Sequence, residues 1–182
     1  MNYKEESGLM SNDRTTDVAP TVLTRDYDAP IELVFEAWTR PEHLQRWQVP
    51  FKGFSFEYAW ADVRAGGGSL HKMTAPNGME MWLRTEYLSI TPPQELSFIQ
   101  YTSNAQGEFV PNPQMPDWPR NLRTTIRLEA MGERTRLQLI WQPVDPSEAE
   151  AAAFESTRAD HGKGWGAGLE SLAGYLDQLA PD

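Results

Sequence analysis

Two neighbouring segments, 121–130 and 134–144, alternate between apolar and polar side chains, and this pattern constrains the fold more than any other feature of the chain. Their apolar positions are Leu122, Ile126, Leu128, Leu137, Leu139 and Trp141. A strand with one apolar and one polar face is typical of an antiparallel sheet that buries only one side. We therefore predict that the two segments form a hairpin in such a sheet.

Five further segments predict strands, because they are rich in β-branched and aromatic residues and are bounded by turn residues. They are residues 21–28, 53–64, 68–75, 78–90 and 95–103. Pro76, Asn77 and Gly78 give a hairpin signal between the third and fourth of these five. The segment 104–120 contains four prolines and no periodicity, and it is too long for a simple turn. It predicts a functional loop or a mobile one.

The sequence predicts helices in two regions. After the first strand, Pro30 begins a helix that Pro41 ends, with Asp28 as the expected N-cap, and Pro41 begins a second short helix that reaches Trp47. Near the C-terminus, an Asp/Ser cap opens a long helix whose apolar stripe continues through Trp165, Leu169, Leu172 and Leu176. Four alternate glycines in 162–168 predict a break or close packing near residues 161–164.

This order of elements predicts an α+β fold in which a curved antiparallel sheet wraps around the long C-terminal helix, with two short helices after the first strand. Residues 20–182 are expected to form a single domain. Residues 1–19 are polar and aperiodic, and we expect them to be a flexible leader.

Composition narrows the possible partners and sites. A net charge of −10 disfavours nucleic acid and anionic membrane surfaces, and no apolar run is long enough for a membrane span. The absence of cysteine excludes disulfides and thiolate metal sites and fits a cytoplasmic protein. The three histidines show no metal-binding spacing, so we expect neither a metal nor another cofactor.

Four motifs carry a family resemblance. "DAPIELVFEAWTRPEHLQRW", "DVRAGGGSLHKM", "YLSITPPQELSF" and "HGKGWGAGLESLAGYLDQL" occur in this order between Thr21 and Leu179. Together they resemble the START-like (SRPBCC) superfamily, in particular the bacterial branch similar to the C-terminal domain of the activator of the ninety-kilodalton heat-shock protein ATPase. The resemblance implies a helix-grip fold with an apolar cavity between sheet and helix. Such relatives bind lipids, sterols or polyketides, and some are cyclases or hydrolases.

The candidate site is an apolar cavity, because ligand pockets are mostly apolar and methionine adapts to varied shapes. The ligand-binding candidates are Trp47, Phe54, Trp60, His71, Met73, Met81, Leu83, Phe98, Met115, Trp118, Trp141, Trp165 and Leu169. Any one of them, taken alone, is more often a core residue. In the loop 104–120, Met115 and Trp118 predict a lid or an interface, unless the loop packs back on its own sheet. His71 is in phase with Met73, so it faces either a ligand or a satisfied structural partner; His43 and His161 are expected to be exposed.

Three functions follow from these features. The first is binding of a small apolar or aromatic molecule, lipid-, polyketide- or aromatic-like. The second is a cyclase- or hydrolase-type enzyme that uses polar cavity groups such as His71, although the sequence contains no catalytic constellation. The third is a co-chaperone-like module that binds a protein partner. A homodimer is also expected if the loop aromatics are exposed.

Overall fold

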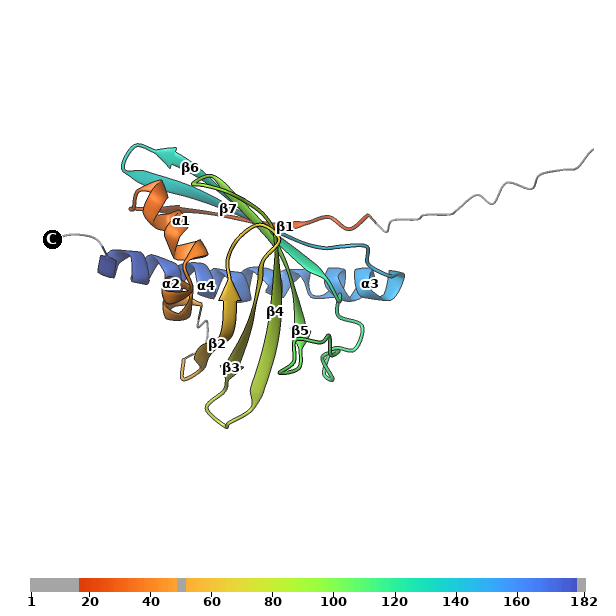
Figure 1. Ribbon diagram of the computed structural model, residues 1–182. Coiled ribbons are helices and arrows are strands. Elements are labelled where there is room, and N and C mark those ends of the chain that lie inside the picture. Colours follow the sequence, from red (N-terminus) through yellow and green to blue (C-terminus); the bar gives the residue numbers. More distant parts are fainter. Residues whose placement is uncertain (1–16, 49–51, 180–182) are drawn as a thin grey trace, which may run out of the picture.

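The structure, a computed structural model, describes residues 17–48 and 52–179 and contains one seven-stranded antiparallel sheet and four helices in that part of the chain (Figure 1). The strands are β1 (Thr21–Tyr27), β2 (Ser55–Asp62), β3 (Gly68–Thr74), β4 (Glu80–Thr91), β5 (Glu95–Ser103), β6 (Leu122–Met131) and β7 (Arg134–Pro143). The helices are α1 (Ile31–Thr39), α2 (Pro41–Trp47), α3 (Glu148–Ser156) and α4 (Arg158–Leu179). The flexible leader predicted for residues 1–19 falls, up to residue 16, outside the described residues.

The sheet has the strand order β1-β7-β6-β5-β4-β3-β2. Consecutive strands from β2 to β7 pair with each other, and β1 pairs with β7, so β1 and β2 are the two edge strands. The sheet curves, and α4 runs across its concave side while α1 and α2 lie near one end (Figure 1). The prediction of an α+β helix-grip fold is confirmed, and each predicted strand is present within a few residues of its predicted bounds.

The two prolines shape the corner between β1 and α2. Pro30 is the N-cap of α1, and Pro41 stands in the first turn of α2, where its missing N–H leaves no helical hydrogen bond unmade. The predicted cap Asp28 makes no capping bond and instead accepts a hydrogen bond from Arg134 Nε at 2.5 Å. Across the corner, the rings of Trp38 and Trp47 pack edge to face with centroids 4.6 Å apart. This pair packs α1 against α2.

Only the C-terminal part of α4 is packed as a core helix. Leu169, Leu172 and Leu176 are buried with the inner faces of the sheet and with α1 and α2. Tyr27 on β1 donates a hydrogen bond to the carbonyl of Leu169 at 3.1 Å. These contacts seat one end of the helix, and the other end is left to border the cavity.

The predicted break in the long helix is displaced along the chain. The helix is interrupted at Thr157, between α3 and α4, and it continues without interruption through residues 161–164. The Thr157 hydroxyl bonds to the carbonyls of Ala153 and Phe154 and so satisfies the end of α3. The glycines therefore cost helix stability without ending the helix.

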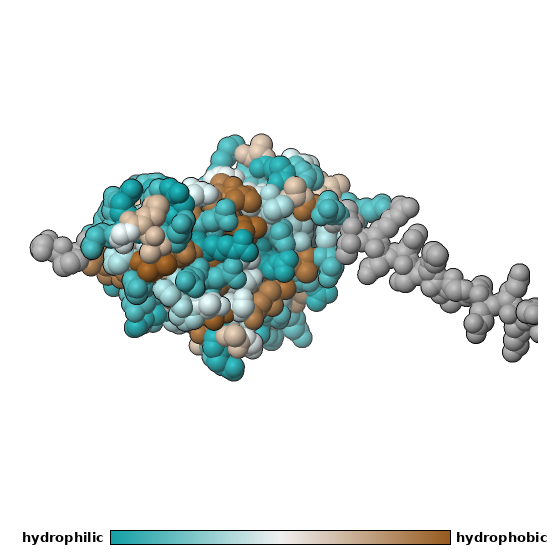
Figure 2. All heavy atoms as spheres, turned by 90° about the horizontal axis from the view of Figure 1, so that it is seen from above, coloured by the Kyte–Doolittle hydropathy of each residue, from teal (hydrophilic) through white to brown (hydrophobic). Residues whose placement is uncertain are grey.

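The outer surface shows no continuous apolar band on the face seen in Figure 2, where hydrophobic residues are interspersed with hydrophilic ones. In residues 17–48 and 52–179, the exposed large apolar side chains are Val22, Trp60, Met79, Met81, Leu88 and Val110. Among the described residues, no helix is both long and apolar enough to cross a membrane.

Glu150 fastens the loop before β6 to α3. Its carboxylate accepts hydrogen bonds from the backbone N–H of Arg120 and of Ser147, both at 2.8 Å, and Ser147 completes a capping box. Burial opposes ionisation of this carboxyl, but the hydrogen bonds from Ser147 and Arg120 outweigh burial and hold its pKa below the ordinary value.

We expect Glu150→Ala to lower the free energy of unfolding by about 1–2 kcal/mol at neutral pH, because it removes two hydrogen bonds to a charged group. The loss should shrink as the pH falls through the lowered pKa, since the carboxylate stabilises the fold only while it is ionised. Urea unfolding over this pH range measures both effects. Glu148→Ala, in the same helical turn, is the control, and an equal loss in both variants would contradict this account.

Candidate functional site

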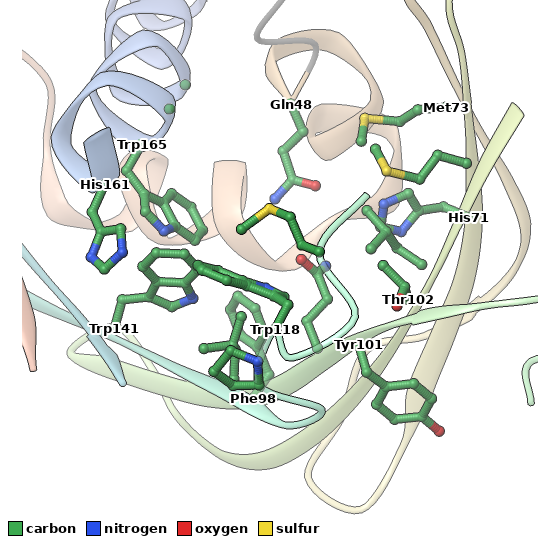
Figure 3. A pocket seen from close by; sticks show the side chains of 18 of the residues that line it. Gln48, His71, Met73, Phe98, Tyr101, Thr102, Trp118, Trp141, His161 and Trp165 are labelled. Atoms are coloured by element: carbon green, nitrogen blue, oxygen red, sulfur yellow. The ribbon is translucent and has the colours of Figure 1, made fainter. Parts of the chain in front are cut away.

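A cavity of about 700 Å³ lies between the N-terminal half of α4 and the inner faces of β3, β4 and β5 (Figure 3). It borders α2 through Trp47 and Gln48, and it borders the loop before β6 through Met115 and Trp118. Ten of the predicted residues line it: Trp47, His71, Met73, Met81, Leu83, Phe98, Met115, Trp118, Trp141 and Trp165. The structure thus brings together side chains from α2, four strands, one loop and α4.

Three predicted residues do not line the cavity. The pairing of β2 with β3 shifts between Tyr58 and Trp60, so Trp60 leaves the inner face. It is 44% exposed on the outer face, under the guanidinium of Arg84 at 4.5 Å from the ring centroid. Leu169 is in the packed core, and Phe54 lies before β2 begins, outside the paired part of the strand.

An aromatic cluster closes one side of the cavity. The ring centroid of Trp141 lies 5.9 Å from that of Trp118 and 6.1 Å from that of Trp165. Figure 3 shows the three tryptophans together. Trp118 also contacts Phe154 of α3 at 6.0 Å. The loop therefore packs back on the sheet, and the aromatic side chain expected to be exposed forms part of the cavity wall.

His161 belongs to this cluster, and the expectation that it is exposed is wrong. It is 5% exposed, because the rings of Trp141 and Phe154 cover its ring, with centroids 4.9 and 4.3 Å away. Nδ1 is 2.6 Å from the Thr21 hydroxyl, and Nε2 is 3.0 Å from the Thr157 hydroxyl. Both ring nitrogens are satisfied, which is the pattern of a structural histidine. His43 is also half-buried, with Nδ1 2.7 Å from the Tyr175 hydroxyl.

His71 differs from His161 in its hydrogen bonding. It faces the cavity from β3, is 3% exposed and stacks on Phe56 with centroids 4.3 Å apart. Neither ring nitrogen hydrogen bonds to another described residue, and Nδ1 is fully buried. Burial lowers the pKa of His71 from 6.5 to about 4, because removal from water disfavours the charged ring. The side chain is therefore a neutral imidazole with unused hydrogen-bonding capacity.

Two glycines of α4 that are not among the predicted site residues also line the cavity. Gly164 and Gly168 lie one turn apart, and a Cβ added at either position would meet nothing within 4 Å. Side chains at these positions would extend into the cavity. The signal was present in the sequence, because glycines at i and i+4 of an otherwise regular helix leave one face without side chains.

Polar groups are few at this site. Gln48, Gln100, Thr102 and Thr157 line it together with the two histidines, and Asp160 is the only charged side chain in the lining within the described part of the chain. Asp160 lies at the exposed rim and is paired with Lys163 Nζ at 2.6 Å. No group of three metal-ligating side chains occurs among residues 17–48 and 52–179.

Comparisons with known proteins agree on the fold. The family described as activator of Hsp90 ATPase homolog 1-like protein matches residues 28–177. A solved protein of Staphylococcus epidermidis is 23% identical, with 91% of this chain and 94% of that one covered and a TM-score of 0.71. Proteins of Arthrobacter aurescens and Mycobacterium smegmatis are 20% and 18% identical, with 90% of this chain and 92% and 91% of theirs covered and TM-scores of 0.73 and 0.67. A search of curated proteins found no match.

The depressed pKa of His71 predicts a specific pH dependence. The unfolded chain takes up a proton at this residue below pH 6.5, whereas the folded protein takes it up only below about pH 4. The wild-type protein should therefore lose about 3 kcal/mol of stability over this interval that His71→Phe does not lose. Urea unfolding at several pH values measures the difference, and parallel stability curves for the two proteins would contradict it.

The open space beside Gly164 predicts a gain in stability on substitution. Gly164→Ala should raise the free energy of unfolding by about 1 kcal/mol, because alanine favours the helix and its methyl group meets no neighbour. Gly78→Ala is the contrasting variant, since Gly78 adopts φ 83° in the hairpin turn and alanine is strained there. In thermal unfolding, Gly164→Ala should melt at a higher temperature than the wild-type protein and Gly78→Ala at a lower one. A destabilised Gly164→Ala protein would show that the space is filled.

Proposed function

This chain belongs to the family of activator of Hsp90 ATPase homolog 1-like proteins, and from that premise we propose that it binds a small apolar or aromatic molecule in the cavity beside α4. The observation that carries the proposal is the apolar cavity of about 700 Å³ itself. This volume lies within the range of sites that bury most of a drug-sized ligand. The resemblance to proteins that bind lipids or polyketides supports the same ligand class.

The cost in helix stability of two glycines in α4 supports the proposal that the cavity has a function. Two glycines on its cavity face cost about 2 kcal/mol of helix stability relative to alanine. Larger apolar residues there would also bury additional surface at about 25 cal/mol per Å². A chain selected for stability alone would fill this space, and burial of an apolar ligand recovers the same surface energy.

Catalysis is less well supported than binding. The enzyme alternative requires an ionisable group that faces the cavity, and His71 does so. A general base that works near neutral pH needs a pKa close to 7, and burial holds the pKa of His71 at about 4. No charged group contacts its ring in the described chain, so the observed geometry favours a hydrogen-bonding role.

The remaining expectations stay predictions. A co-chaperone-like role depends on a partner surface that the cavity does not supply. The prediction of a homodimer depends on exposed aromatic side chains in the loop 104–120. Trp118 of this loop is instead half-buried against Trp141. The cytoplasmic location still depends on the cysteine-free composition.

Nile red, a neutral apolar dye that fluoresces in apolar surroundings, tests the proposed function. We expect it to bind the wild-type protein, and we expect Gly168→Phe to weaken binding by about tenfold or more because the ring occupies the cavity. Fluorescence titration measures both dissociation constants.

Gly174→Phe is the matched control for this experiment. Gly174 is also in α4 with nothing within 4 Å of an added Cβ, but it does not line the cavity. This variant should bind Nile red as the wild-type protein does. Equal binding by all three proteins would place the dye elsewhere, and no binding by the wild-type protein would refute the proposal.

A further inference from the structure

The inner end of the cavity contains polar atoms that lack partners. The Nδ1 atom of His71 and the Nε1 atom of Trp38 are both buried without a hydrogen bond to any described residue. Both residues border a small void of about 10 Å³. This void shares four lining residues with the main cavity: Gln48, His71, Phe98 and Gln100. His71 therefore lies where the main cavity adjoins this void, and Trp38 lies behind it, on the void alone.

Gln100 adds a free acceptor at the same place. Its Nε2 donates to the Thr85 hydroxyl at 3.1 Å, which leaves the side-chain oxygen without a partner among the described residues. His71 and Gln100 thus offer the cavity one acceptor oxygen and an imidazole that both donates and accepts. Each buried polar atom that stays unpaired costs free energy, because it has lost its hydrogen bonds to water. A ligand group that pairs with these atoms recovers this cost.

The two buried histidines differ in whether their ring nitrogens have hydrogen-bond partners. His161 lies in a similarly aromatic environment, yet both of its ring nitrogens have hydroxyl partners within 3.0 Å. His71 has none, although Tyr58 and Thr85 lie around the same void. The chain therefore satisfies a structural histidine where it has one, and it leaves the polar edge of His71 toward the cavity.

Charge restricts which ligand group fits. No lysine or arginine lines either void in the described chain, so an anionic group would enter without a counter-charge. Burial also raises the pKa of Tyr58 and Tyr87, which keeps both phenols neutral beside the void. A cation would meet only neutral groups there as well. The site is therefore suited to an uncharged group that both donates and accepts hydrogen bonds.

We propose that His71 and Gln100 form a polar anchor that binds a neutral hydroxyl or phenol group on an otherwise apolar ligand. This inference rests on the proposed function, because the anchor needs an apolar body in the main cavity. Figure 3 shows His71 on the side of the cavity opposite the three tryptophans, so the aromatic wall can hold the body of a ligand whose hydroxyl points toward His71.

Two probes of nearly equal shape test the anchor. 2-Naphthol carries a neutral hydroxyl at pH 7, and 2-methylnaphthalene carries a methyl group in its place. The measured quantity is the ratio of their dissociation constants, by calorimetry, in the wild-type protein and in His71→Phe. We expect the preference for 2-naphthol to fall by about tenfold in His71→Phe, with little change for 2-methylnaphthalene, since phenylalanine keeps the stacking on Phe56 but offers no nitrogen.

Two further variants make the result specific. His71→Asn restores a side-chain nitrogen near the position of Nδ1 and should recover part of the preference for 2-naphthol, and it serves as the readout if His71→Phe does not fold. His43→Phe makes the same change outside the cavity lining and should leave the ratio as in the wild-type protein. 2-Naphthoate, which brings a carboxylate to the same place, should bind more weakly than 2-naphthol by about tenfold or more.

The outcomes separate this inference from the proposed function. An unchanged ratio in His71→Phe, or 2-naphthoate binding as tightly as 2-naphthol, overturns the anchor and leaves apolar binding in place. Failure of 2-naphthol to bind a protein that binds Nile red also overturns the anchor. Failure of Nile red and of both naphthalene probes refutes the proposed function, and the anchor with it.

Discussion

The unequal packing of α4 is the constraint on which the rest of the structure depends. Leu169, Leu172 and Leu176 seat the C-terminal half of the helix on the sheet and on the corner between α1 and α2. The N-terminal half presents Gly164 and Gly168 to the same side, and these two positions leave open space beside Trp165. One straight helix thus serves as core at one end and as cavity wall at the other. The cavity is a consequence of side-chain size along a single helix face.

The contacts at the ends of the helices keep this space from collapsing. The aromatic cluster of Trp118, Trp141, Phe154 and His161 packs where α3 meets α4, and the Trp38–Trp47 pair packs at the α1–α2 corner. Rigid aromatic contacts at both places hold the helix and the sheet apart between them, since close-packed rings resist small displacements. Glu150 adds a polar tie that keeps the loop before β6 against α3.

Much of the fold could be predicted from the sequence because period-two alternation, turn residues and prolines act locally. The face shared by Leu122, Ile126 and Leu128 is buried as predicted, and Pro41 begins α2. The position of Trp60 could not be predicted in this way. A shift of one residue in the pairing of β2 with β3 reverses which side chains face inward, and this shift depends on the neighbouring strand. The burial of His161 depended likewise on Trp141 and Phe154, which lie elsewhere in the chain.

The sequence by itself determined the elements, their order and the apolar faces, because these depend on each residue and its near neighbours. It also contained most of the residues that line the cavity, since strand alternation places them on one face. Only the tertiary structure decided that the glycines of α4 face open space and that His71 lacks hydrogen-bond partners where His161 has two. Both facts depend on distances between atoms far apart in the sequence, and no local pattern encodes whether a buried polar atom is satisfied.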